Sequence, residues 1–148
     1  MAAWPAVRNA LAAGAGGLPE FADASIYVGP TPTNEAPTKA FEVGFVNDEN
    51  NAGTYSRALA YDGTVWSETG DVRSTLVANA GDSDPLVAEG DAFDMADALI
   101  AWVEADPTLG GVLSLDSEVR LAVDVLSISN PDGTATELVL TLTYTTTT

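Results

Sequence analysis

Residues 118–145 read EVRLAVDVLSISNPDGTATELVLTLTYT, and this stretch does most to decide the fold. Apolar residues occupy every second position of its first part, at Val119, Leu121, Val123 and Val125. They do so again in its last part, at Leu138, Leu140, Leu142 and Tyr144. Strict alternation is typical of a strand with one buried face, and the Asn-Pro-Asp-Gly between the two runs is a turn sequence. The stretch therefore predicts a β-hairpin.

The alternation changes phase inside the first of these strands. Val125 shares a face with the apolar residues before it, whereas Leu126 and Ile128 fall on the opposite face. A β-bulge, which is one extra residue in one strand of an antiparallel pair, produces this flip. We therefore expect a bulge between Val125 and Leu126.

More strands are predicted earlier in the chain. Residues 25–28 form a short apolar run that a Gly-Pro pair stops, residues 41–45 alternate at period two, and residues 55–80 are β-like throughout. Within the last run, Gly70 beside Asp71 is typical of a tight hairpin turn, because glycine readily adopts the positive φ that such turns need. A turn is therefore expected at Gly70-Asp71, and Asp62-Gly63 earlier in the same run can also turn.

Two helices are predicted. The first begins near Trp4-Pro5, where proline suits the opening turn, and ends at the glycines at positions 14, 16 and 17. That glycine cluster superficially resembles a phosphate-binding loop, but it follows a helix instead of opening one and no Walker lysine accompanies it. The second helix spans residues 91–105 and is stopped by Asp106-Pro107.

The second helix is apolar around most of its circumference, and its acids Asp94, Asp97 and Glu104 lie near one stripe. An apolar arc this wide exceeds what one face of a single sheet covers. We therefore expect the helix to contact a neighbouring subunit. The residues predicted for that contact are Leu99, Trp102 and Val103.

The predicted elements fit one domain, since the 148 residues are about the length of a single domain. Strands, a helix and further strands, with an additional helix at the front, define an α+β fold. The simplest layer arrangement is an antiparallel or mixed β-sheet with two helices packed on one face.

Charge and composition exclude several classes of function. The formal net charge is −17, which disfavours binding to nucleic-acid phosphates or to anionic lipid and leaves proteins as the expected partners. The sequence has no histidine and no cysteine, which excludes Ser-His-Asp triads, cysteine nucleophiles, disulfides and Cys/His zinc sites. The first residues lack the features of a signal peptide or a membrane span, so we expect a soluble protein that is not exported by that route.

Two kinds of acidic site remain open from the residues alone. Oxygen ligands for calcium are offered by Asp48, Asn50, Asp82, Asp84 and Glu89, although their spacing is not that of an EF-hand loop. A pair of carboxylates could catalyse hydrolysis, but nothing distinguishes Asp124, in mid-strand, from an acid at an edge or interface. No metal ligand, cofactor or catalytic residue is assigned. Trp66 and Trp102 are expected to be core or interface anchors, because an aromatic ring buries a large area.

The proline-rich residues 29–39 can only form an extended loop, and binding residues concentrate on exposed loops. Contact with a partner protein is predicted for Pro30, Pro32 and Thr33 in this loop. It is also predicted for Gly70 and Asp71 at the expected hairpin turn.

Several short motifs follow one another in a distinctive order. They are Ile-Tyr-Val-Gly-Pro at 26–30, Phe-Glu-Val-Gly-Phe at 41–45, Trp-Ser-Glu-Thr-Gly-Asp-Val at 66–72, the helix at 92–105, Asp-Pro-Thr-Leu-Gly-Gly at 106–111 and Tyr-Thr-Thr at 144–146. Together they resemble the small tail terminator, or tail completion, proteins of long-tailed bacteriophages, especially those of actinobacterial phages. The motif at 106–111 is the most specific, because a proline stop followed by two glycines fixes how the helix leads into the next strand. Residues 31–39 and 81–89 match no part of the family pattern.

This resemblance implies a structural virion protein without catalytic residues or cofactors, located at the tail–neck junction and assembled in the host cytoplasm. It implies a ring, usually a homohexamer, that caps the head-proximal end of the tail tube and stops tube polymerisation. The implied partners are the tail tube protein and the head-completion or connector protein. DNA would pass through the channel without specific binding, and no membrane is involved. Another neck or tail-tube component is the main alternative, and an acidic calcium-binding module or hydrolase is a further one.

Overall fold

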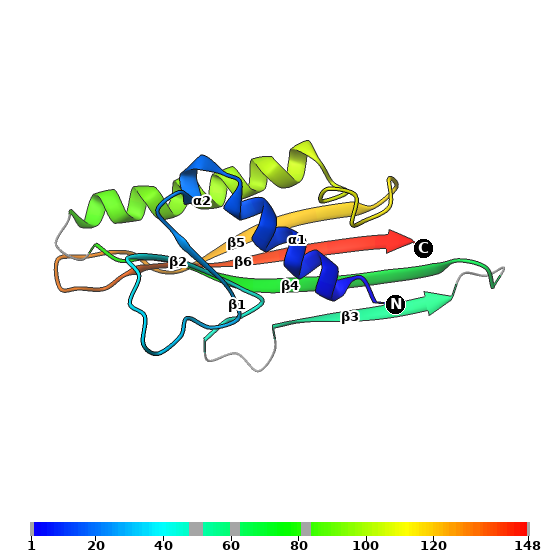
Figure 1. Ribbon diagram of the computed structural model, residues 1–148, viewed down its shortest axis with the longest axis horizontal. Coiled ribbons are helices and arrows are strands. Elements are labelled where there is room, and N and C mark those ends of the chain that lie inside the picture. The colour runs from blue at the N-terminus through cyan, green and yellow to red at the C-terminus, as the bar shows by residue number, and fades with distance from the viewer. Residues whose placement is uncertain (1, 48–51, 60–62, 81–83, 148) are drawn as a thin grey trace.

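The computed structural model describes residues 2–47, 52–59, 63–80 and 84–147 of the chain. Its elements in chain order (Figure 1) are α1 (Trp4–Gly16), a 3₁₀ turn η1 (Pro19–Phe21), β1 (Ser25–Val28), β2 (Lys39–Val43), β3 (Gly53–Leu59), β4 (Trp66–Ala78), α2 (Pro85–Ala105), β5 (Glu118–Ser127) and β6 (Thr136–Thr147). They form one sheet with a helical layer over it, which confirms the predicted α+β fold.

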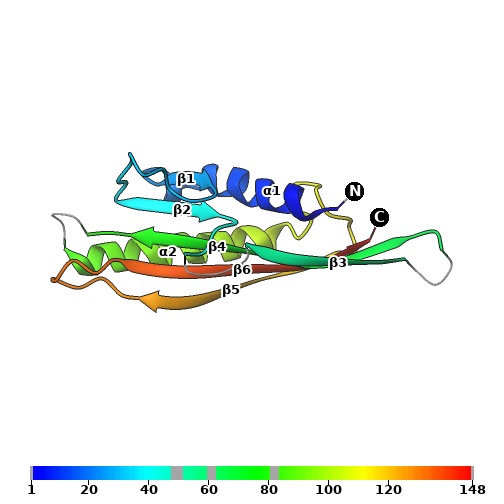
Figure 2. The same cartoon turned by 90° about the horizontal axis from the view of Figure 1, so that it is seen from below.

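The described strands form one six-stranded mixed sheet around β4 (Figure 2). The order is β1-β2-β4-β6-β5, in which β1 and β2 are parallel and the other pairs are antiparallel. One edge of β4 pairs with β6 over almost the whole length of β4. The other edge of β4 is shared by β3 and β2. There β3 pairs with residues 66–72 and β2 with residues 75–78. The long strand β4 therefore joins two parts of the sheet.

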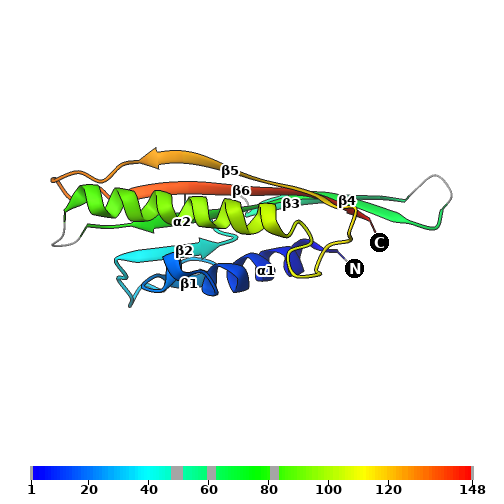
Figure 3. The same ribbon diagram turned by 90° about the horizontal axis from the view of Figure 1, so that it is seen from above.

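Both helices lie on the same face of the sheet, as predicted (Figure 3). The residues of β6 that alternate under the helices are almost fully buried, namely Leu138, Leu140, Leu142 and Tyr144. They belong to one core with residues of β4, α1 and α2. Since burial of a large apolar side chain contributes roughly 1.5–3 kcal/mol, this alternation holds the two layers together.

The β5–β6 hairpin contains the predicted bulge. Val125 lies opposite Leu138 and Ser127 lies opposite Glu137, so the register shifts across Leu126. The extra residue explains why the apolar pattern changes phase at this point.

The predicted hairpin turn at Gly70-Asp71 is wrong, because β4 continues through both residues. Gly70 is buried between Tyr55 of β3 and Tyr144 of β6 in the sheet register. A Cβ atom at Gly70 would lie 2.7 Å from the hydroxyl oxygen of Tyr144 and 2.8 Å from the carbonyl oxygen of Thr54. Glycine is required here by the close approach of its neighbours.

The chain instead reverses between the end of β3 and the start of β4. Gly63 in this connection has a φ of +74°, in the left-handed region that favours glycine. The possible turn residue Asp62 that precedes it in the sequence lies outside the described residues.

Helix α1 extends beyond the first glycine of its predicted end. It includes Gly14 and Gly16, and only Gly17 follows it. A Cβ atom at Gly14 would lie 2.3 Å from Cζ2 of Trp102 in α2. Gly14 therefore lets the two helices approach each other, and it does not terminate α1.

Helix α2 begins at Pro85, earlier than the predicted start at residue 91. The Asp84 carboxylate accepts a hydrogen bond from the Leu86 backbone N–H at 2.9 Å and so caps the helix. Pro85 occupies the first turn, where its missing N–H costs nothing. Gly90 consequently lies inside the helix.

The broad apolar arc of α2 is covered within the chain itself. Leu99 and Val103 are 0% and 3% exposed and lie in the core, which corrects the inference that they face a neighbouring subunit. Trp102 is half-buried and packs against α1. The second buried face of α2 is therefore provided by α1 and η1.

Replacing Gly14 with alanine should lower the free energy of unfolding by about 1–3 kcal/mol, because the new methyl group would overlap the Trp102 ring. Gly90→Ala is the matched control, since Gly90 is also helical but has no atom within 4 Å of the added Cβ position. That control should raise the free energy of unfolding by up to about 1 kcal/mol. Urea denaturation measures both. Equal stability of the two variants would contradict the contact.

Candidate functional site

The strand β3 and the first half of β4 form an arm, residues 53–59 and 63–72, whose outer end extends beyond both helices (Figures 1 and 2). Tyr55, Leu59 and Trp66 of this β3–β4 arm are 52%, 48% and 42% exposed. The three share the sheet face that the helices cover elsewhere, because Leu59 lies opposite Trp66 and Tyr55 lies opposite Gly70. The arm therefore presents apolar side chains without a helix over them.

A buried carboxylate in the outer half of the arm ties it to α1 and β6. Glu68 is 3% exposed, and its oxygens accept hydrogen bonds from the Ala3 backbone N–H at 3.0 Å and from the Tyr144 hydroxyl at 2.5 Å. Nε of Arg57 lies 3.5 Å from Oε1 of Glu68. The Arg57 guanidinium also stacks over the exposed Trp66 ring, 4.9 Å from its centroid. These contacts join α1, β3, β4 and β6 at one point.

Asp71 links the two strands of the arm on the opposite face. Its carboxylate accepts hydrogen bonds from the backbone N–H and the hydroxyl of Thr54, at 2.7 and 2.9 Å. Its backbone carbonyl accepts a hydrogen bond from Nε1 of Trp4 at 2.6 Å. Gly70 is buried, so of the two predicted contact residues at the expected turn only Asp71 keeps a partly exposed side chain.

Sequence reasoning does not locate this arm because it places the hairpin turn at Gly70-Asp71. The possible turn at Asp62-Gly63, which the sequence also predicts, is the signal that indicates the arm. Trp66, expected to be buried or at an interface, is exposed within the described chain.

The proline-rich loop between β1 and β2 is held against the sheet. The Tyr27 hydroxyl donates to the Glu35 carboxylate, which raises the pKa of Tyr27, and the Thr31 backbone N–H donates to Glu42 at 2.7 Å. The loop borders a hollow of about 430 Å³ over β2 and β4. The predicted contact residues of this loop, Pro30, Pro32 and Thr33, are all exposed.

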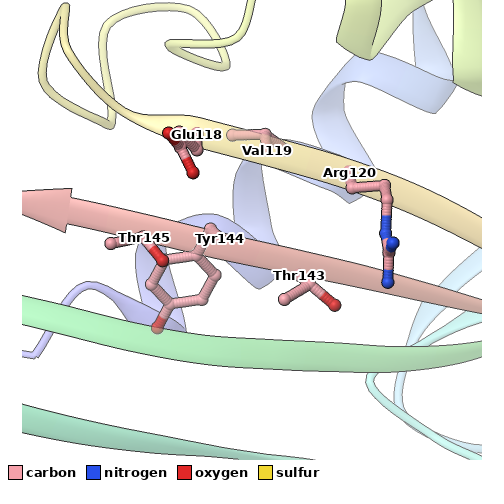
Figure 4. Close-up of a pocket in the computed structure, with 6 residues that line it drawn as sticks. All are labelled: Glu118, Val119, Arg120, Thr143, Tyr144 and Thr145. Atoms are coloured by element: carbon pink, nitrogen blue, oxygen red, sulfur yellow. The ribbon is translucent and has the colours of Figure 1, made fainter.

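The sheet face away from the helices is rich in hydroxyl groups. One hollow of about 320 Å³ lies on β5 and β6 (Figure 4), where Glu118 is opposite Thr145 and Arg120 is opposite Thr143. A second hollow lies beside it and includes Thr69 and Thr143. Hydroxyls with scattered charges suit hydrogen bonding to a polar surface or to water.

The segment at 106–111 is a tightly bonded turn. The Asp106 carboxylate accepts hydrogen bonds from the Thr108 hydroxyl and backbone N–H and from the Gly110 N–H, at 2.5, 3.0 and 2.9 Å. These bonds lower the pKa of Asp106, the Thr108 hydroxyl most. Leu109, Gly110 and Gly111 all have positive φ, which explains the glycine pair.

The predicted calcium ligands are only partly within the described residues. Asp48, Asn50 and Asp82 lie outside them, and Asp84 caps α2. Across the described ranges, no three or more acidic side chains are grouped closely enough to hold a metal ion. Asp124 is exposed on the edge strand β5, opposite Val139.

No protein family model matches the chain, and no curated protein is significantly similar to it. None of the helices in the described part of the chain is long and apolar enough to cross a membrane. The interpretation of the site therefore depends on its geometry and on the motif order.

Tyr144→Phe should lower the free energy of unfolding by about 1–3 kcal/mol, because it removes a hydrogen bond to the buried Glu68 carboxylate. Burial and the Glu68 carboxylate raise the pKa of Tyr144 above the ordinary value of about 10. The wild type should therefore lose stability as pH rises above about 10, where only the unfolded chain ionises this hydroxyl, and the variant should lose less. Tyr27→Phe removes a tyrosine whose pKa is raised by a solvent-exposed hydrogen bond, so it should change this pH dependence less and is the comparison for urea denaturation across this pH range.

Proposed function

We propose that this protein is a structural subunit of a bacteriophage virion, a tail terminator that closes into a ring on the head-proximal end of the tail tube. The ring, of about six copies in a closed cyclic arrangement, stops further polymerisation of the tube. It then offers the surface to which head-completion or connector proteins bind. The role is structural and involves no cofactor.

The observation that carries this proposal is the apolar face of the β3–β4 arm. Exposed apolar side chains that gather on one face of a protein mark contacts with other proteins. On this face Leu59 and Trp66 are cross-strand neighbours, and Arg57 lies between them and Tyr55. Tyr55, Leu59 and Trp66 lie on one face of an arm that Glu68 ties to β6. A ring subunit needs such a surface, because head-to-tail contacts between identical copies are what close a ring.

The motif order supports the particular kind of ring. The motif on which the resemblance to tail terminators depends most is the bonded turn at 106–111. The exposed residues Pro30, Pro32 and Thr33 are the proposed contacts with the tube or the neck. Exposed loops on a rigid sheet commonly carry such specificity.

The acidic charge is consistent with a channel that DNA crosses. At −17 for each chain, a ring of about six copies carries a total of about −100. Acidic side chains facing the channel would repel phosphate, so the genome would not adhere during exit. The same charge also keeps an apolar subunit soluble before assembly.

Negative-stain electron microscopy of the purified protein should show single closed rings with a central hole. A tail-tube component would polymerise into open-ended tubes, and an acidic calcium-binding module or hydrolase would form neither. Heat in a calcium titration would favour the calcium-binding module. Monomers at every concentration tested would contradict the proposal.

Leu59→Asp should abolish the rings, because an unpaired charge buried in an apolar contact costs several kcal/mol. Val28→Asp is the matched control, since Val28 is similarly exposed, at 55% against 48% for Leu59, but lies on β1 away from the arm. Sizing chromatography with circular dichroism would separate loss of assembly from loss of folding. Loss of rings in both variants or in neither would contradict a specific role of the arm.

A further inference from the structure

We infer that neighbouring copies join edge to edge, with β3 of one copy pairing with β5 of the next so that the sheet continues from copy to copy. The inference rests on the proposed self-assembly and adds the surface and the register through which it occurs.

Two long strands of the described sheet have an unpaired edge. β5 pairs only with β6, and β3 pairs only with β4. A third edge strand, β1, has four residues. Exposed edges present a row of unsatisfied backbone N–H and C=O groups, which makes them templates for pairing with another chain.

The directions of the two edges suit one another. From β3 to β5 the sheet passes through β4 and β6, and each step is antiparallel, so β3 and β5 run in opposite directions. A second copy shifted sideways in the plane of the sheet would bring its β3 antiparallel to β5. The helices of both copies would then lie on the same side.

On the helix-covered face, the side chains of α2 beside β5 can contact those of an incoming β3. Asp91 is bonded to Lys39 of β2 and Trp102 packs against α1, so these residues mark the flank of α2 toward β2. By helical spacing, the other flank, toward β5, carries the half-buried Phe93 and Ile100 with the exposed Asp97 and Glu104. Tyr55 and Leu59 of an incoming β3 would lie beside this flank.

The charges on the two edges allow β3 of a second copy to occupy this edge. Helix α2 carries no basic residue. It carries five acidic residues, which are Glu89, Asp91, Asp94, Asp97 and Glu104. The strand β3 carries Arg57 and no acid. Because Arg57 is already paired with Glu68 of its own chain, an incoming β3 adds no acid to this flank and avoids like-charge repulsion there.

The bulge and the alternation fix one register. The regular edge of β5 before the bulge is residues 118–125, which admits the seven residues of β3 in two registers that differ by one residue. A slip of one residue turns every side chain to the other face. Only the register with Ser56 opposite Ala122 keeps Tyr55 and Leu59 on the helix side.

The cysteine-free chain allows this register to be tested by cross-linking. Within one chain β3 and β5 are three strand spacings apart, about 14 Å at ~4.8 Å each. That exceeds the ~7 Å that a disulfide can span between Cα atoms. Ser56→Cys with Ala122→Cys should therefore form only disulfides between copies, giving covalent multimers larger than dimers on mild oxidation.

The matched control is Ser56→Cys with Thr141→Cys, because Thr141 is opposite Ala122 on β6 and one strand further from the edge. The control and each single-cysteine variant should yield at most dimers. Only monomers and dimers from the Ser56/Ala122 pair, or equal cross-linking of the control, would overturn the inference.

Hydrogen exchange on the unmodified chain gives a second measurement. Amides of residues 53–59 and 118–125 should become more protected as concentration rises, and unchanged protection in visible rings would overturn the edge contact while leaving the ring proposal intact. Cross-linked open filaments without closed rings would lead to the opposite conclusion about these two proposals. They would support the edge contact and contradict the tail terminator function.

Discussion

The Glu68 carboxylate is the interaction on which the geometry of this molecule depends most. A buried charge is costly unless it is bonded, and here the backbone N–H of Ala3 at the N-cap of α1, a hydroxyl from the last strand and a guanidinium from β3 all converge on it. The arm therefore cannot move relative to α1 and β6 without breaking the bonds of that charge to Ala3 and Tyr144. Its exposed face is held in one orientation before any partner arrives, which reduces the entropy lost on association.

The parts of the fold that sequence predicted are those in which the signal is local. The β5–β6 hairpin and its bulge follow from alternation among neighbouring residues, so the phase change at Leu126 was readable without the structure. The prediction starts α2 too late, at residue 91, because Gly90 just before it resembles a helix boundary, whereas Asp84 and Pro85 define the real start. Glycine inside a helix is unfavourable but tolerated, so its presence alone does not mark an end.

The errors at Gly14 and Gly70 have one physical origin. A glycine serves either a positive φ or a close approach, and neighbouring residues do not reveal which. The groups that crowd these two positions, Trp102 and Tyr144, lie far away along the chain. The same limit applies to the contact predicted for α2, because a wide apolar arc does not show whether α1 or another copy covers it. The candidate assembly surface emerged only once β4 was seen to run unbroken.

The contact between Gly14 and Trp102 has a consequence for how the sequence can diverge. With no space between the Cα of one and the ring of the other, a larger residue at position 14 is compatible with the same helix crossing only if position 102 becomes smaller. The same reciprocity links Gly70 to Tyr144. In evolutionary relatives of this chain, a larger residue at one position of each pair should therefore accompany a smaller residue at the other. Such covariation in an alignment would reveal both contacts.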